Sequence, residues 1–317
     1  MEQKPREWRW GKFRWILLAI IILQIILSGL YPPLMPNIQV KAEPLPFLTF
    51  GGFVVTNTLV ATLLGDIILI LLALAVRRVY TKESVIPKGI TGVIETLIEL
   101  IYNQTESSAG KWAKVIFPYF ATITLLVLVA NWVELFPGVD SIGLLEKEAA
   151  HGAKCVYTQV LPGIEAVSGD RACAQTVVPF VRVASTDLNF TIALAIISVF
   201  MTQVIGVRAQ GMKYFQKFIN TTTMWTKPAF GAIDFGVGLL ELVSEFSKIL
   251  SFSFRLFGNI FAGSVLLFVI GSLVPVFLQA GFLTFEFAIG LIQAVVFGML
   301  TMIFMTMATQ GHGSEEH

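Results

Sequence analysis

The sequence predicts an all-α integral membrane protein, and three observations lead to this fold class. First, 55% of the 317 residues are hydrophobic and only 14% are charged, whereas soluble domains carry about 25% charged residues. The mean hydropathy is +0.76. Second, several apolar runs reach the length of about 20 residues that a helix needs to cross the hydrocarbon core. Third, lysines and arginines gather in alternate segments between those runs, as in multi-pass membrane proteins.

Five runs are predicted to cross the membrane as helices, at residues 57–76, 115–136, 188–207, 229–269 and 282–309. As one helix, the fourth run would be about 60 Å long, twice the hydrocarbon thickness of about 30 Å. We therefore expect the last two helices to be long and steeply tilted, or the fourth to extend beyond the bilayer. Pro275 should separate these two helices because proline lacks the N–H that a helix needs.

Two further segments have a different character. Residues 85–110 repeat apolar positions at helical spacing with glutamates between them, which is typical of an amphipathic helix lying at the membrane interface. Residues 1–14 are basic and aromatic and precede a short apolar run at 16–30. This run is either a retained signal-anchor helix, which we favour, or the apolar core of a cleaved signal peptide.

The distribution of basic residues predicts the orientation of the chain. Segments 1–15, 77–114 and 208–228 hold about three times as many lysines and arginines as 31–56 and 137–186, and the basic side faces the cytoplasm. Both termini should then be cytoplasmic.

The polar loop 138–186 should lie outside. It contains Cys155 and Cys173, and because the outer side is oxidising, a disulfide between them is a reasonable expectation.

Polar side chains recur along one face of the predicted helix 229–269. The set is Asp234, Glu241, Glu245, Lys248, Phe252, Arg255 and Asn259, spaced by three, four or seven residues. Glu245 and Lys248, three residues apart, have an alternative interpretation as a structural ion pair.

Arg255 is different, because no acidic residue lies three or four positions away from it. Its guanidinium stays charged at any reachable pH, and at bilayer depth it costs at least about 2.5 kcal/mol. Its counter-charge must come from another helix or another chain.

Enzyme motifs are absent from the sequence. It contains no phosphate-binding GxxxxGK[ST] loop, no GxSxG nucleophile motif and no HExxH zinc motif. The three histidines lie in polar segments without metal-ligand spacing, and the net charge of +1 gives no indication of nucleic-acid binding. We therefore expect a non-enzymatic chain without a metal or cofactor.

Three motifs resemble subunit a of the F-type ATP synthase. They are RLFGNIFAG at 255–263, TDLNFTIALA at 186–195 and LIQAVVF at 291–297. The resemblance covers residues 51–310. The outer loop 138–186 lies within this range, but it is an addition to the usual family pattern, and no function is transferred to it. Residues 1–50, with the extra span and a linker, and the polar tail 311–317 are additions to the family pattern or lie outside it.

The resemblance implies a fold of five family helices and a stator function in a rotary ATP synthase of the bacterial inner membrane. Such a subunit provides two offset proton half-channels at the interface with the c-subunit ring and couples proton flow to ring rotation and ATP synthesis. Arg255 would separate the half-channels and face the ring carboxylate. Further implied partners are membrane lipid, the b-type peripheral stalk and, indirectly, the F1 sector, where the ATP chemistry takes place.

The resemblance also assigns positions to individual residues. Asn259 and Gln293 match positions that line the site, although both are also plausible as plain interhelical hydrogen-bonding residues. Glu241 matches the carboxylate of the cytoplasmic side. Ser264 stands where many bacterial members have glutamate, and Glu286 where those members have histidine, so we expect Glu286 to serve the outer half-channel alone.

Four secondary candidates complete the set: Lys248, Glu245, Asp187 and Asn189. The last two have an alternative interpretation as a helix cap. A self-contained transporter is the competing function, but such proteins usually contain internal repeats, and none is visible here. A purely structural anchor would not explain an isolated arginine within an apolar run.

Overall fold

The computed structural model describes residues 42–50, 53–81, 90–136, 139, 142–146, 155–161, 164–169, 176–218, 228–273 and 277–310, together with single positions between 15 and 26. The predicted N-terminal span and the tail 311–317 lie largely outside these residues. The chain forms two compact units. The first combines 1–38, 143–178 and 264–285, and the second combines 39–142, 179–263 and 286–317.

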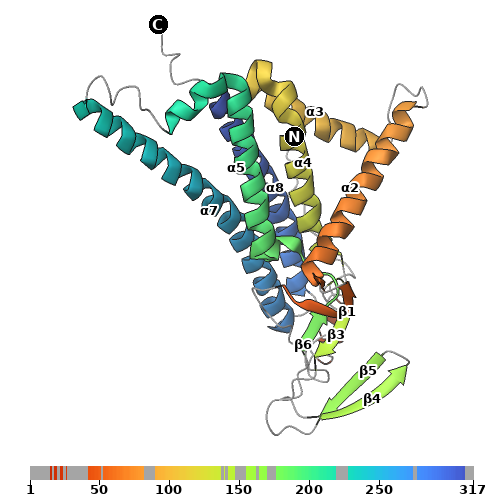
Figure 1. The fold of residues 1–317 in the computed structure, drawn as a ribbon. Helices are drawn as coiled ribbons and strands as arrows, with labels where there is room; N and C mark the ends of the chain where they lie inside the picture. The colour runs from red at the N-terminus through yellow and green to blue at the C-terminus, as the bar shows by residue number, and fades with distance from the viewer. Residues whose placement is uncertain are drawn as a thin grey trace, which may run out of the picture. The chain divides into compact units, whose positions relative to one another are not determined.

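The second unit is helical and contains most of the predicted spans. Its helices are α2 (Asn57–Thr81), α3 (Ile90–Ala109), α4 (Ala113–Trp132), α5 (Leu188–Gln210) and the larger parts of α7 (Pro228–Leu273) and α8 (Phe277–Thr309). Short 3-10 helices are η1 (Gly110–Trp112), η2 (Val133–Leu135), η5 (Ala184–Thr186) and η6 (Gly211–Lys217). Five helical segments of the described chain are long and apolar enough to cross a membrane, which confirms the predicted class (Figure 1).

The predicted amphipathic helix is present as α3, and it runs across the ends of α2 and α4 (Figure 1). Ile101 is buried on one side of α3, whereas Val93 and Leu100 are exposed on the other. Gly110 has a φ of 51°, a left-handed conformation that glycine adopts without a steric penalty. This residue therefore allows the chain to change direction between α3 and α4.

The core of the second unit lies between α4, α5, α7 and α8. Val127 from α4, Ala195 from α5, Leu256 and Ile260 from α7, and Ala294 from α8 are all nearly inaccessible and belong to one cluster. The same part of α7 carries the RLFGNIFAG motif. The motif is therefore fixed to the core by its apolar residues.

Helices α4 and α8 approach closely because α8 has small residues at every fourth position, namely Gly290, Ala294 and Gly298. A methyl group on Gly290 would lie 3.2 Å from the Asn131 side chain. One on Gly298 would overlap the hydroxyl of Thr124. Repeated small residues at this spacing let two membrane helices approach closely, so that side chains of α4 contact the backbone of α8.

Short strands, which the sequence pattern does not predict, accompany the helices. In the second unit, β1 (Pro44–Phe50) pairs antiparallel with β2 (Phe53–Thr56) immediately before α2. In the first unit, β4 (Cys155–Leu161) pairs antiparallel with β5 (Ile164–Gly169).

A second pairing in the outer loop joins β3 (Gly143–Glu146) to β6 (Thr176–Pro179). Cys173 lies outside the described residues, so the Cys155–Cys173 disulfide stays a prediction. The loop that the sequence pattern presents only as polar therefore contains local β-structure.

Candidate functional site

The polar residues of α7 do not form one uniform face. Arg255 and Asn259 are exposed, whereas Glu245 and Phe252 are buried. At 3.6 residues per turn, the predicted set covers an arc of about 80°. The boundary of the packed core runs through this arc, so neighbouring members of the set have opposite environments.

Arg255 is exposed on α7, and its neighbour in sequence, Phe254, is exposed as well. Within the described residues it makes no ion pair and no side-chain hydrogen bond. Asn259, one turn further along, is likewise exposed. Among the described residues, therefore, no other helix of this chain supplies a counter-charge to Arg255.

Glu286 occupies a buried position on α8. The helix begins at Phe277, five residues before the predicted start at 282, so Glu286 lies well inside it rather than at its first turn. Its carboxylate rests directly on the backbone of Gly263, where a methyl group would overlap both carboxylate oxygens. In the described part of the chain, no donor reaches Glu286 Oε1.

The C-terminal end of α4 contacts α8 next to Glu286, through one aromatic stack and two hydrogen bonds. The Trp132 ring stacks on Phe287 with centroids 4.5 Å apart, and Trp132 Nε1 donates to the Phe287 carbonyl at 3.3 Å. Asn131 Nδ2 donates to the Gly290 carbonyl at 3.1 Å, and Asn131 Oδ1 accepts from Ser185 Oγ at 2.6 Å. In the sequence, Asn131 is a polar residue near the end of an apolar run, and nothing in the sequence predicts these hydrogen bonds.

The other candidates near the motif have different surroundings. Ser264 is buried and is the first α7 residue of the first unit. Gln293 is half-buried on α8, and among the described residues its side chain makes no hydrogen bond, so it does not contact Arg255 in this way.

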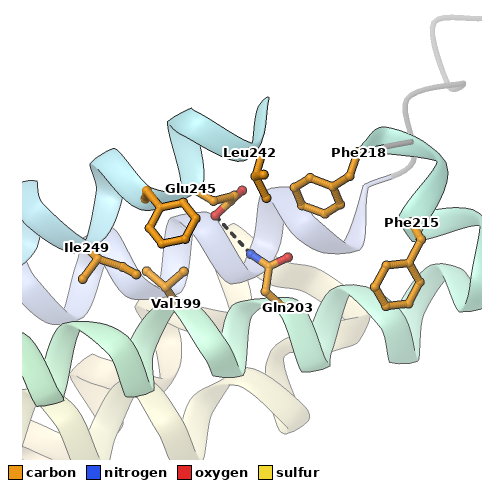
Figure 2. Close-up of a pocket in the computed structure, with 8 residues that line it drawn as sticks. Val199, Gln203, Phe215, Phe218, Leu242, Glu245 and Ile249 are labelled. Carbon is orange, nitrogen blue, oxygen red and sulfur yellow. Dashed lines mark hydrogen bonds between the residues drawn. The ribbon is translucent and has the colours of Figure 1, made fainter. Parts of the chain in front are cut away.

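A cluster of charged and polar groups lies between α5, η6 and α7. We call it the charge cluster, and its members are Gln203, Tyr214, Lys217, Glu241, Glu245 and Lys248. The predicted Glu245–Lys248 pair is present, with Lys248 Nζ 2.7 Å from Glu245 Oε1. Gln203 Nε2 donates to Glu245 Oε2 at 3.0 Å (Figure 2).

Lys217 is the charged member of the cluster that the sequence analysis did not single out. Its Nζ lies 2.5 Å from Glu241 Oε1 and 3.4 Å from Glu245 Oε1. An apolar cavity of about 420 Å³ adjoins Glu245. Figure 2 shows Phe215 and Phe218 on one side of this cavity and Leu242 on another.

Asp187 caps α5, in agreement with the alternative interpretation of the TDLN motif. Its Oδ1 accepts from the Asn189 backbone N–H at 2.9 Å, and its Oδ2 accepts from Thr58 Oγ1 at 3.0 Å. Substitution of such a cap typically costs about 1 kcal/mol. The geometry therefore gives Asp187 a structural role that links α5 to α2. The Asn189 side chain is exposed.

Comparison with known proteins decides the family. The model of the ATP synthase A chain family matches residues 58–306, which is most of the chain. The chain belongs to this family. An ATP synthase subunit a from Helicobacter hepaticus is 30% identical over 262 residues, covering 81% of this chain and 90% of the relative. One from Mycobacterium bovis is 27% identical over 272 residues, covering 84% and 91%.

A third relative, from Propionigenium modestum, is described as a sodium ion specific ATP synthase subunit a. It is 27% identical over 255 residues, covering 80% of this chain and 74% of the relative.

Membership of the ATP synthase A chain family determines the coarse function. The chain is a multi-pass membrane subunit of the Fo sector, and it takes part in ion translocation together with the c-ring and the rest of the complex. The catalytic chemistry belongs to other chains. Among the described residues, no three His, Cys, Asp or Glu side chains gather to hold a metal ion.

Proposed function

We propose that this chain forms two offset proton half-channels at the interface with the c-ring, and that Arg255 separates them. One observation carries the proposal: a permanently charged arginine is exposed on an apolar helix and has no ion-pair partner among the described residues of its own chain. Such a charge requires a partner, since an intramembrane cation without one is costly. The ionised carboxylate of a ring subunit supplies it.

The separating action follows from the chemistry of the guanidinium. Because it does not lose its proton, it cannot pass a proton from one half-channel to the other. It attracts each ionised ring carboxylate and leaves a protonated one without an attractive partner. Protons therefore travel with the rotating ring instead of leaking past Arg255. Asn259, one turn along the same face, contacts the ring next to this point, and Gln293 lines the site from α8.

The outer half-channel uses Glu286 as its carboxylate. Support comes from its burial, from the oxygen that no described donor reaches, and from the glycine surface under the carboxylate. An ionisable group in a membrane segment without a fixed partner is a candidate for proton transfer. Ser264 is the other polar residue of the motif region on this side.

The inner half-channel uses Glu241. It lies fourteen residues from Arg255, about 21 Å along the helix, toward the end of α7 that carries the charge cluster. Glu286 lies on the other side of the arginine, seven residues before Gln293 and about 10 Å from it along α8. Carboxylates at two depths, with a fixed cation between them, are the arrangement that two offset paths require.

The same proposal includes the setting of the subunit. Both termini face the cytoplasm and the outer loop faces the opposite side of a bacterial inner membrane, as the basic residues indicate. The b-type peripheral stalk holds the subunit against the ring, and the F1 sector is an indirect partner.

The test is ATP-driven acidification of inverted membrane vesicles, comparing wild type with Arg255→Ala. We expect pumping to be lost while the bound ATPase remains, because the ring carboxylate loses its counter-charge. Arg208→Ala is the matched control, since Arg208 is also exposed but lies near the end of α5. Repeating the assay with and without Na⁺ distinguishes proton from sodium transport. Normal pumping by Arg255→Ala, with an intact passive-leak control, would refute the proposal.

A further inference from the structure

We propose that Lys217 is a positioning residue for Glu241, and that it fixes this carboxylate in the inner half-channel. The inference rests on the proposed role of Glu241 and adds a residue to it that no motif contains. Lys217 comes from η6, which is outside α7 and α8, so the inner path would depend on a third element.

The position of Lys217 is determined by the way η6 begins. Gly211 ends α5 with a φ of 64°, which turns the chain back toward α7. Tyr214 then packs its ring onto Gly206 of α5, where any side chain would overlap it. The Tyr214 hydroxyl donates to Gln203 Oε1 at 2.7 Å. Because residues three apart align in a 3-10 helix, Lys217 follows on the same side as Tyr214.

The ammonium group of Lys217 is shared between two carboxylates of α7. It is 2.5 Å from Glu241 Oε1 and 3.4 Å from Glu245 Oε1, and its side chain is 21% exposed. Glu245 has two other donors, Lys248 and Gln203, whereas Lys217 is the one ion-pair partner of Glu241 in the described part of the chain. Glu241 therefore depends on Lys217 for its position.

The charge cluster is balanced in formal charge and contacts a further helix. Two lysines and two glutamates cancel in formal charge, so the cluster can be partly buried without a net charge. Lys248 also lies over the Phe304 ring of α8, with 4.7 Å between Nζ and the centroid. The cavity beside Glu245 is lined mainly by apolar side chains. Apart from Glu245 itself, Gln203 is the one polar lining residue, so only Gln203 can hydrogen-bond to the Glu245 carboxylate from this side (Figure 2).

The chemical consequence is that Glu241 has one defined orientation. A carboxylate on an extended side chain samples several rotamers, and an ion pair with an anchored lysine selects one of them. A proton relay needs donor and acceptor within hydrogen-bond reach, so a fixed orientation increases the rate of transfer. Removal of the lysine should slow proton conduction even when the subunit is fully assembled.

The experiment measures passive proton conductance of vesicles after removal of the soluble ATPase sector, normalised to the amount of assembled subunit. We expect Lys217→Gln to reduce conductance at least about threefold, within the range of energetic coupling between contacting groups. Lys217→Arg keeps the charge and should restore most of it. Lys213→Gln is the matched control, because Lys213 is exposed on the same segment and makes no ion pair among the described residues.

A double-mutant cycle shows whether Lys217 acts through Glu241. If it does, Lys217→Gln has no further effect in a Glu241→Gln background. Additive losses would overturn the inference. Normal conductance of Lys217→Gln beside a defective Glu241→Gln would also overturn it and leave the proposed function intact. Normal conductance of Glu241→Gln would instead remove the proposed role of Glu241, and the inference with it.

A charge-matched variant keeps the test valid if Lys217→Gln fails to assemble. Lys217→Gln combined with Glu245→Gln leaves one lysine and one glutamate, so it avoids an excess buried carboxylate. Glu241 still loses its partner in this variant, and conductance per assembled subunit should fall as for the single change. Wild-type conductance of this double variant would contradict the inference.

Discussion

Two ionisable residues of the motif region, Arg255 and Glu286, have opposite environments. Arg255 is exposed without an ion-pair partner among the described residues, whereas Glu286 is buried against the backbone of Gly263. In the proposed function, Arg255 pairs with a carboxylate of another subunit, and this requires access to the protein surface. A carboxylate that relays protons needs a protected position with room for its oxygens. Gly263 provides that room, since any larger residue would occupy the same space.

Gly263→Ala therefore tests the position of Glu286. The added methyl group overlaps the carboxylate and must displace it. The carboxylate is the end of a flexible side chain and can move aside, so the expected effect is on its position. We expect a five- to tenfold loss of ATP-driven pumping, or roughly 1–1.4 kcal/mol in the transfer barrier. Gly236→Ala is the control in the same helix, because no atom of the described chain lies within 4 Å of the added methyl group. Equal pumping by the two variants would contradict the assigned position of Glu286.

At the scale of elements, the contact between α4 and α8 determines the geometry on both sides of Glu286. The row of Gly290, Ala294 and Gly298 brings the helices close enough for Asn131 to donate to a backbone carbonyl of α8. Trp132 makes a second such bond one turn earlier. The register of α8 relative to α4, and with it the depth of Glu286, depends on this contact.

Gly298→Ala should weaken this contact. Alanine favours a helix over glycine by up to about 1 kcal/mol, but the methyl group would overlap Thr124 and crowd the Phe120 ring, at a cost of about 1–3 kcal/mol. The overpacking cost should exceed the gain in helix propensity, so the detergent-solubilised complex should lose this subunit at a lower temperature. Gly281→Ala, also in α8, meets no described atom within 4 Å and should not lower that temperature. An unchanged temperature for Gly298→Ala would argue against close packing of α4 and α8.

At the scale of the whole molecule, the basic segments predict an orientation in the membrane. Lysines and arginines resist transfer across the membrane and therefore stay in the cytoplasm near the ends of spans. By this rule we expect η6 and the charge cluster to face the cytoplasm and residues 138–186 to face the other side. With this orientation, the proposed inner half-channel and the proposed positioning lysine would share one side of the membrane.

Labelling of single cysteines checks this orientation. Met212→Cys in η6 and Ile142→Cys before β3 place thiols at positions that are 79% and 64% exposed. In intact cells, a membrane-impermeant maleimide should label the second variant only. In inverted vesicles it should label the first only. The wild-type chain gives the background from Cys155 and Cys173, and the reverse pattern would invert the topology.

By itself, the sequence determined the membrane class, the five family spans, the family and the Glu245–Lys248 pair. These properties depend on the length of apolar runs, on short motifs and on neighbours within one helical turn, all of which are local along the chain. The helix start at Phe277 and the hairpins before α2 and in the outer loop were not predicted, because apolar periodicity does not mark short strands or a helix that continues past a glycine.

Only the tertiary structure decided which side of α7 meets the core, that Gly263 lies under Glu286, and that Lys217 pairs with Glu241. Each is a contact between residues more than twenty positions apart in the chain. Such contacts depend on how the helices pack, because the spacing within one helix defines a face but not the neighbour that the face receives.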